Sequence, residues 1–516
     1  MAEAEAVLAE RGKQSLPSFR NAAGFRVEDV PVVEPGALRR AAVDACLAGD
    51  RIVALLGLPD AGGLEVLLVL ADDAAVALRV LRTRVAAGSA LPSLASELPQ
   101  AQAFERELHE QHGALIVGHP ALEPLRQHPG VAGGSNGAGG SEAHRFFQVK
   151  GASVHEVAVG PVHAGIIEPG HFRFQCHGEE VLSLEIRLGY QHRGAEALLL
   201  ESSPARRLVI AESIAGDTAV GHALAYCTAM ESLAGAEAPV AAAAIRGILL
   251  ELERVANHIG DLGALAGDVA YLPAASYFGR LRGNFLNLLM ELSGNRYGRG
   301  LLLPGGVRRG LDDSTRAAFL DRIARDEAEL EAVADLMFDA ASVLARFERT
   351  GFVSEATARE LGLVGVVARA SGVARDVRHD HPAGVFVSAE LPVAVAKTGD
   401  VMARALVRRL EVRRSLAFVK QQLRALPARA LATRALATEV GAAAPGRMVV
   451  ALVEGWRGEI AHVAVTDARG HLRAYKIVDP SFHNWFGLGV ALRNNPISDF
   501  PLCNKSFNLS YAGHDL

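Results

Sequence analysis

Hydrophobic and polar residues follow two different periods along this chain. Residues 51–60 and 64–72 are almost continuous apolar runs bounded by turn residues, a pattern that predicts two buried strands. Residues 73–87 space their apolar side chains so as to predict a helix, and residues 101–113 predict a strongly charged helix. The first part of the chain is therefore expected to form a small α+β unit.

The rest of the chain changes period twice. Between residues 156 and 189, apolar and polar residues alternate among Gly and Pro, which predicts antiparallel strands. From about residue 195 the period becomes helical, and the alternation returns over 447–480. Three long helices are expected, over 241–268, 319–347 and 399–426. The predicted fold class is α+β, with a large helical bundle that receives strands from both of its ends.

One segment separates the two parts. Residues 128–144 consist mainly of Gly, Ala and Ser without periodicity, which is typical of a flexible linker. We therefore expect a small domain over 1–127, a linker over 128–145 and a large domain over 146–516. The sequence shows no internal repeat.

Composition narrows the possible functions. Half of the 516 residues are hydrophobic, enough for a large buried interior. The net charge of −5 and the lack of long basic runs give no sign of nucleic-acid binding. The N-terminus has no secretory h-region, and no run of about 18 apolar residues predicts a membrane span. Four cysteines that stand singly, with no CxxC pair, fit a reducing cytoplasm.

Residues 211–227 keep the frame of a metal-binding loop without its ligands. Ala215 and Thr218 stand where a C-x-x-C-x-x-x-H pattern would place two cysteines, and His222 stands at the histidine position. Nickel and low-spin iron need soft anionic sulfur, which Ala and Thr do not supply. Gly-rich stretches elsewhere lack the residues of a phosphate loop, so no nucleotide site is predicted.

Five further stretches support a resemblance to one superfamily. They are GYQHRGAEALL (189–199), ELERVANHIGDLG (251–263), LSGNRYGRGLLLPGGV (292–307), ASGVARDVRHDHP (370–382) and EGWRGEIAHVAV (454–465). In this order they resemble the quinone-proximal, D-type large subunit of respiratory complex I and the large subunits of group 4 [NiFe]-hydrogenases. Residues 91–126 resemble the C-type subunit family of complex I, and a fused C-plus-D arrangement is similar to hydrogenase-4 and formate hydrogenlyase large subunits.

The resemblance explains why residues 211–227 keep the spacing of a metal-binding loop. In the hydrogenases the first CxxC falls at Ala215 and Thr218, and the second follows an Asp-Pro, which here gives Ser481 and Asn484. All four thiolates are absent, so no nickel–iron centre is expected. In complex I, a His on the first β-loop and a Tyr in the degenerate loop hold the quinone headgroup, and here Ile167 and Gly216 occupy those positions. His163 and His171 are the nearest substitutes, and quinone binding is an open expectation.

Several polar residues are candidates for the site that the resemblance implies. Glu168 resembles a hydrogenase proton-passing Glu, although Pro169 interrupts the family pattern, and a surface pair with Arg173 is an equal alternative. Asp217 and His222 are expected to form a carboxylate–imidazole pair, with a satisfied core histidine as the alternative. The remaining candidates are His192 and Arg193, implied to lie near a partner's cluster, and Arg457 and Asp479, implied to lie at the metal frame.

We therefore expect the large subunit of a complex I-like, hydrogenase-related oxidoreductase. The resemblance implies an iron–sulfur small subunit similar to the B-type subunit of complex I, a ferredoxin-like subunit, and membrane subunits of the complex I and antiporter type. It implies electron transfer coupled to proton or ion translocation, at the cytoplasmic face of the inner membrane. The alternatives are a non-catalytic scaffold that transmits conformational change and, against the missing cysteines, an active hydrogenase or formate hydrogenlyase subunit.

Overall fold

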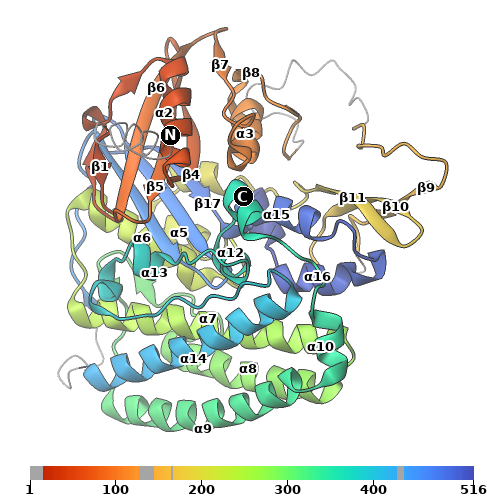
Figure 1. The fold of residues 1–516 in the computed structure, drawn as a ribbon. Coiled ribbons are helices and arrows are strands. Elements are labelled where there is room, and N and C mark those ends of the chain that lie inside the picture. Colours follow the sequence, from red (N-terminus) through yellow and green to blue (C-terminus); the bar gives the residue numbers. More distant parts are fainter. Residues whose placement is uncertain (1–15, 127–143, 164–166, 427–434) are drawn as a thin grey trace.

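A computed structural model describes residues 16–126, 144–163, 167–426 and 435–516. Figure 1 shows the N-terminal sheet at the top, a second sheet below it and a layer of long helices at the bottom. The α+β fold class is confirmed. Almost all of the linker predicted over 128–145 lies outside the described residues, and the domain boundaries remain a prediction.

The N-terminal unit is built around one antiparallel sheet with strand order β1-β6-β5-β4, and the short β3 pairs parallel with β6. Its elements are β1 (Ser18–Phe19), β2 (Phe25–Arg26), β3 (Val32–Val33), α2 (Pro35–Leu47), β4 (Arg51–Asp60), β5 (Gly63–Asp72), β6 (Ala77–Ala86), β7 (Ala90–Pro92), α3 (Gln102–His112) and β8 (Leu115–Val117). The strands predicted at 51–60 and 64–72 and the charged helix at 101–113 are confirmed.

The helix predicted over 73–87 is wrong. Residues 77–86 form strand β6, which pairs with β5 along its whole length. Strand formation buries Leu78, Val80 and Val85, and Arg79 reaches carboxylates of Asp50 and Asp72. Because the buried guanidinium of Arg79 is paired with carboxylates, this arginine-containing segment can form a strand inside the sheet.

The large unit begins with an antiparallel sheet of order β11-β10-β9, which projects to the right in Figure 1. Its strands are β9 (Val154–Val159), β10 (His171–His177) and β11 (Glu180–Arg187). A second sheet contains β15 (Arg447–Glu454), β16 (Glu459–Thr466) and β17 (Leu472–Val478), and β2 of the N-terminal unit pairs with β15. The antiparallel strands predicted in both regions are confirmed.

The helices pack around α7, which is buried along most of its length. The helical segments are α4 (Ala195–Glu201), α5 (Pro204–Ala211), α6 (Ala219–Ala234), α7 (Val240–Asp268), α8 (Leu272–Ser293), α9 (Asp313–Phe338), α10 (Ala341–Phe347), α11 (Glu355–Glu360), α12 (Gly365–Ala370), α13 (Val377–Asp380), α14 (Val401–Ala425), α15 (Pro480–Ala491), α16 (Phe500–Phe507) and α17 (Tyr511–Asp515). Helix α7 carries the predicted 241–268 segment, and residues 319–347 divide between α9 and α10. Within the described ranges, none of the helices combines the length and the apolar character needed to cross a membrane.

An ionic cluster joins the two units at Asp73. Its carboxylate accepts hydrogen bonds from Arg51 (3.1 Å) in β4 and from Arg375 (2.7 Å) and His381 (3.0 Å) of the large unit. Arg51 also makes a bidentate pair with Glu459 at 2.6 and 2.5 Å. Buried charges that are paired across a boundary hold its two sides in one arrangement. The contact between the two units is therefore held by ion pairs as well as by apolar packing.

We expect Asp73→Asn to lower the free energy of unfolding by about 3 kcal/mol at neutral pH, because Arg375 loses its carboxylate partner. Burial would raise the pKa of Asp73, but Arg51, His381 and Arg375 hold it well below its ordinary value. This stabilisation is therefore present above the unfolded-state pKa of about 4 and is lost as the pH falls below it. Urea unfolding followed by tryptophan fluorescence measures the difference between the two proteins.

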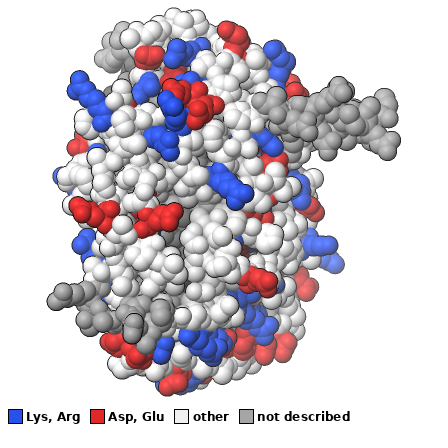
Figure 2. All heavy atoms as spheres, turned by 90° about the vertical axis from the view of Figure 1, so that its left-hand side faces the viewer, with Lys and Arg blue, Asp and Glu red and all other residues white. Residues whose placement is uncertain are grey.

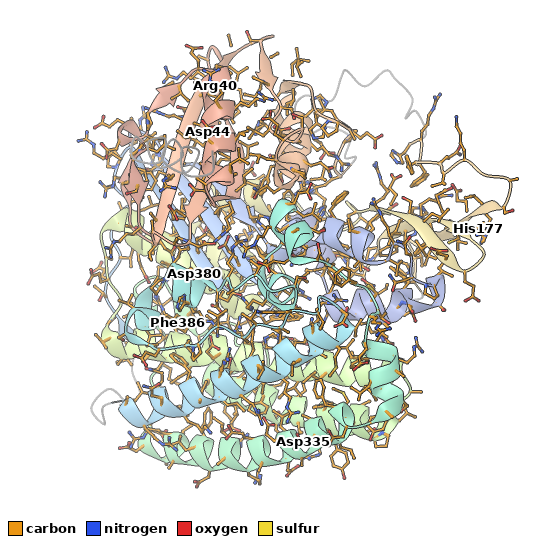
Figure 3. All side chains as sticks on the ribbon, viewed as in Figure 1. Arg40, Asp44, His177, Asp335, Asp380 and Phe386 are labelled. Atoms are coloured by element: carbon orange, nitrogen blue, oxygen red, sulfur yellow. The ribbon has the colours of Figure 1, made fainter. Side chains whose placement is uncertain are left out.

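Asp44, exposed on α2 and labelled in Figure 3, provides the matched control. Asp44→Asn should leave the unfolding curve within about 0.5 kcal/mol of the parent. A difference between parent and Asp73→Asn that persists unchanged at pH values of about 3 would contradict the electrostatic explanation.

Candidate functional site

The first half of the frame is a buried loop that enters α6. Thr218 donates its backbone N–H to the carbonyl of Ala215 (3.0 Å), and both residues are buried. The indole Nε1 of Trp456 donates to the Asp217 carbonyl and to Thr218 Oγ1, at 3.1 Å each. Because its polar groups are already bonded, the loop keeps its shape without a metal.

The second half is the N-terminal turn of α15. Asp479 caps this helix by accepting from the Ser481 backbone N–H (2.8 Å). Ser481 Oγ accepts from the Ser510 N–H (2.8 Å), and the Asn484 amide exchanges two hydrogen bonds with the Val364 backbone, at 3.0 and 3.1 Å. Capping by Asp and closure by Ser and Asn thus stabilise the turn locally.

A hydrogen-bonded chain of side chains joins the two halves. His222 Nε2 donates to Asp479 Oδ2 (3.0 Å), and His222 Nδ1 lies 3.1 Å from His462 Nε2. His462 Nδ1 in turn lies 2.8 Å from the Tyr475 hydroxyl. The chain is buried from end to end, and burial followed by the proximity of His222 lowers the pKa of His462 well below its ordinary value.

Arg457 connects the frame loop to the C-terminal residues of the chain. Its guanidinium forms a bidentate pair with Asp217 at 2.6 and 2.8 Å, and Nε donates to the Asn508 carbonyl (2.5 Å). Burial would raise the pKa of Asp217, but Arg457 holds it below its ordinary value. The expected Asp217–His222 pair is wrong: Asp217 pairs with Arg457, and His222 pairs with Asp479. A fork-shaped guanidinium outcompetes imidazole for a carboxylate because it offers two parallel donors.

Glu168 lies at the edge of the site, just before β10, and its side chain is exposed. This exposed edge is called the rim below. Its Oε2 accepts from the Tyr511 backbone N–H (3.2 Å), and desolvation raises the pKa of Glu168 against the opposing effects of this bond and of Arg457. The alternative of a Glu168–Arg173 surface pair does not occur, because Arg173 pairs with Glu156. A raised pKa on an exposed carboxyl group beside a buried charged site suits a group that exchanges protons with that site.

The histidines beside the rim brace a loop. His163 Nε2 lies 2.8 Å from the Gly170 carbonyl, and His171 Nδ1 lies 3.0 Å from the Gly160 carbonyl. A carbonyl oxygen only accepts, so each of these ring nitrogens carries a proton. The two histidines thus tie the ends of the loop between β9 and β10, and their predicted role in quinone binding stays a prediction.

His192 and Arg193 hold chain segments around the site. His192 Nδ1 donates to the Asp515 carbonyl (2.8 Å), while the exposed Arg193 donates to the carbonyls of Ser213 and Ile214 at 2.7 Å each. Helix α17 lies against the frame so closely that a Cβ on Gly513 would fall 2.5 Å from Cγ of Asp479. His192 and Arg193 therefore hold both the frame loop and the final helix, α17, in place.

Sequence reasoning missed four residues of this site: His462, Tyr475, Trp456 and Glu253. Both carboxylate oxygens of Glu253 accept backbone N–H groups at the start of α6, from Val220 (2.7 Å) and Gly221 (3.1 Å). Burial raises the pKa of Glu253 to about 8 in spite of these bonds. A carboxylate inside an otherwise apolar helical period was the available signal for Glu253, and His462 stood within a quoted motif.

The frame does not fit a nickel–iron centre. Ala215 offers no ligand atom, and the oxygens of Thr218, Ser481 and Asn484 are hard, neutral and engaged in the bonds described above. Elsewhere in the described ranges, Glu123, His144 and Glu185 bring ligand atoms within 4.8 Å of one another, but Arg187 lies 3.3 Å from Glu123 and already supplies a cation. The frame is therefore held by hydrogen bonds among ionisable and polar side chains.

The helical bundle holds the four-position frame between the loop that enters α6 and the N-terminal turn of α15. Residues 268–515 match the family described as respiratory-chain NADH dehydrogenase, 49 Kd subunit. The chain belongs to this family together with its hydrogenase relatives.

Individual relatives come from both branches. The chain is 31% identical to the carbon monoxide-induced hydrogenase of Rhodospirillum rubrum, over 69% of this chain and 98% of the relative. It is 29% identical to formate hydrogenlyase subunit 5 of Escherichia coli, over 82% of this chain and 76% of the relative. It is also 29% identical to the D 2 subunit of the NADH-quinone oxidoreductase of Herpetosiphon aurantiacus, over 67% of this chain and 94% of the relative. The relatives are thus subunits of oxidoreductase complexes.

Proposed function

We propose that this chain is the large subunit of a membrane-associated oxidoreductase complex of the complex I type, in which the former metal frame handles protons. The observation that carries the proposal is selective replacement. The four sulfur positions hold a methyl group and neutral hydrogen-bonding groups, while Glu168, Asp217, His222, Arg457 and Asp479 surround the frame. Buried ionisable groups cost free energy, and an inert site is filled more favourably by apolar side chains.

The proposed reaction divides between subunits. Electrons reach the interface from an iron–sulfur small subunit that docks at the rim near Arg193 and Glu168, and a ferredoxin-like subunit supplies them. Glu168 at the rim takes up a proton, and the frame holds its charge through the Asp479–His222–His462 chain. Peripheral docking on membrane subunits at the cytoplasmic face couples protonation to ion movement. A quinone is the proposed class of acceptor, and the relatives named as NADH-quinone oxidoreductases support it.

Because the frame lacks thiolates, we expect the purified complex to contain no stoichiometric nickel. The measurement is elemental analysis of the assembled complex, with iron expected only in the amount that the partner clusters account for. One nickel per chain would overturn the proposal and restore an active hydrogenase.

We expect Glu168→Gln to leave assembly intact and to lower turnover by about 100-fold, because the amide keeps the Tyr511 hydrogen bond but carries no exchangeable acid proton. Turnover is followed in membranes as the oxidation of reduced viologen by a short-chain quinone. Glu156→Gln, which alters a carboxylate on the neighbouring strand β9, is the control and should retain turnover.

The outcomes separate the two functional classes. A Glu168→Gln complex that assembles and turns over like the parent removes Glu168 from proton transfer. An assembled parent complex that transfers no electrons to any acceptor would favour a scaffold that transmits conformational change.

A further inference from the structure

A second group of buried charges lies outside the frame, between α7, α12, α13, α14 and the end of β15. Arg369 donates to Glu454 (2.7 Å) and pairs with Glu411 (2.7 Å). Arg254 pairs with Glu411 and lies 3.3 Å from Glu251. Every one of these side chains is almost fully buried.

The remaining members close the cluster. Arg378 pairs with Asp376 (2.6 Å) and with Glu251 (2.9 Å), and His258 Nε2 donates to Glu411 (2.9 Å). Ser415 adds a neutral donor to Glu251 (2.5 Å). The cluster therefore contains four carboxylates (Glu251, Asp376, Glu411, Glu454) and three guanidinium groups (Arg254, Arg369, Arg378).

Two charges beside the cluster offset each other: the half-buried Arg414 acts electrostatically on Glu411, and the Asp380 carboxylate accepts from the Asp376 N–H (2.9 Å). Arg408 is paired with Asp261 (2.6 Å), and Arg375 belongs to the Asp73 cluster (2.7 Å). Asp380, labelled in Figure 3, is paired with the exposed His379 (2.8 Å). One carboxylate of the cluster is thus in excess, and a buried net charge is costly unless a proton neutralises it.

Glu454 is the carboxylate that suits this proton. Arg369 and Arg254 hold the pKa of Glu411 well below its ordinary value in spite of burial, and Arg378 holds that of Asp376 at about 2. For Glu454, burial outweighs Arg369 and raises the pKa to about 7. Its Oε1 accepts from Arg369, and Oε2 accepts from the Val377 backbone N–H (3.1 Å). Burial also lowers the pKa of His258, against the opposing effect of Glu411.

A cavity gives this carboxylate access to water. It has a volume of about 700 Å³ and is lined by Glu454, Arg378, Glu231 and Phe386 among others, with the N-terminal residues of α7 and the last residues of α14. Two of its lining residues, Val240 and Val387, are 88% and 69% exposed, so the cavity is open to solvent. Figure 2 views this side of the molecule, where uncharged side chains occupy most of the middle band.

We propose that Glu454 holds one exchangeable proton for this cluster and receives it from water in the cavity at the N-terminal end of α7. In the uptake step, hydronium transfers a proton to the Glu454 carboxylate and leaves a water molecule in the cavity. The cluster then contains three anionic carboxylates and three guanidinium groups, and its buried charge is balanced. Release reverses the same step.

The proton site also touches the hairpin that carries Arg457. Arg254 donates to the carbonyls of Glu454 (3.1 Å) and Gly455 (2.5 Å), and the His258 ring meets Trp456 edge-on at 6.2 Å. Trp456 and Arg457 in turn hold the frame loop. We infer that the charge state of the cluster influences the frame through this hairpin, and this link rests on the proposed function.

Infrared difference spectroscopy on the assembled complex tests the proton site without any need for turnover. Glu253 should contribute one carbonyl band of an un-ionised carboxylic acid as the pH falls, with a midpoint near 8. Between about pH 8.5 and about pH 5.5, Glu454 should add a second such band, with a midpoint near 7. In deuterium oxide this band should shift, because the proton exchanges through the cavity. A spectrum of the parent complex with no such titrating, exchangeable band would overturn the proposal by itself.

Two variants assign the band. Glu454→Gln should abolish it, whereas Glu231→Gln, which alters another cavity-lining carboxylate that is paired with Arg246, should leave it unchanged. If the band with its midpoint near 7 persists in Glu454→Gln, the proton lies elsewhere and the assignment is contradicted, whereas the Glu253 band near 8 should remain in this variant. Ala241→Phe, which adds a ring to the cavity lining, should slow deuterium exchange severalfold, and unchanged exchange would contradict the access route.

Reduction of the complex by viologen tests the link to the hairpin. The midpoint of the band should move on reduction if cluster and frame are coupled. A midpoint that stays constant overturns the link alone, and it bears on neither the proton site nor the turnover assay.

Discussion

Glu411→Gln is expected to lower the free energy of unfolding by about 3–5 kcal/mol, the range for removing one partner from a buried ionic network. Glu411 accepts from His258 and pairs with Arg254 and Arg369, all of which are buried. The amide removes one negative charge and leaves two guanidinium groups with weaker compensation. Urea unfolding followed by the fluorescence of Trp456 and Trp485 measures the change.

Glu331→Gln is the matched control. Glu331 pairs with Arg409 (2.8 Å) and Arg413 (2.5 Å) between α9 and α14, and its side chain is 23% exposed. Partly solvated pairs contribute little, so this variant should stay within about 1 kcal/mol of the parent. Equal losses in the two variants would show that burial does not set the strength of the network.

Asp479→Asn should lower turnover of the assembled complex by about 100-fold or more while the chain stays folded. Asn caps helices as well as Asp does, so the N-terminus of α15 keeps its hydrogen bond to Ser481. The amide carries no charge to hold the proton of His222, which lies 3.0 Å from the carboxylate. The measurement is viologen oxidation by a short-chain quinone, together with a thermal unfolding curve.

Asp312→Asn provides a control with the same chemistry at a distant place. Asp312 caps α9 by accepting from the Thr315 N–H (2.7 Å) and takes no part in the frame. This variant should keep both turnover and assembly. Normal turnover in Asp479→Asn would remove the Asp479–His222 pair from proton handling and leave it as a structural link between the two loops.

The candidate site was only partly predictable. The loss of the four thiolates and the placement of Asp217, His222, Arg457 and Asp479 at the frame were predicted from the resemblance of the quoted motifs to the family. Their pairing was not, because Asp217 and Asp479 are chemically equivalent partners for His222. The approach of Arg457 from the β15–β16 hairpin decides between them, since its guanidinium binds Asp217 through two donors.

The fold, too, was only partly predictable from the sequence. Continuous apolar runs identified β4 and β5, and the long period of α7 identified the central helix. The same reasoning assigned residues 73–87 to a helix, although residues 77–86 form strand β6. The structure makes them a strand by supplying Asp50 and Asp72 as partners for Arg79.

The sequence by itself determined the fold class, because this depends on local periods, and its motifs determined the family frame and the absence of sulfur at the four ligand positions, through their resemblance to the family. Tertiary structure alone decided which polar side chains meet: Asp73 with Arg375, Glu411 with Arg254 and Arg369, and His222 with His462. Most of these contacts join residues separated by 150 or more positions. Local sequence carries no record of such distances, and the balance of charge in a buried cluster exists only once the chain has brought its members together.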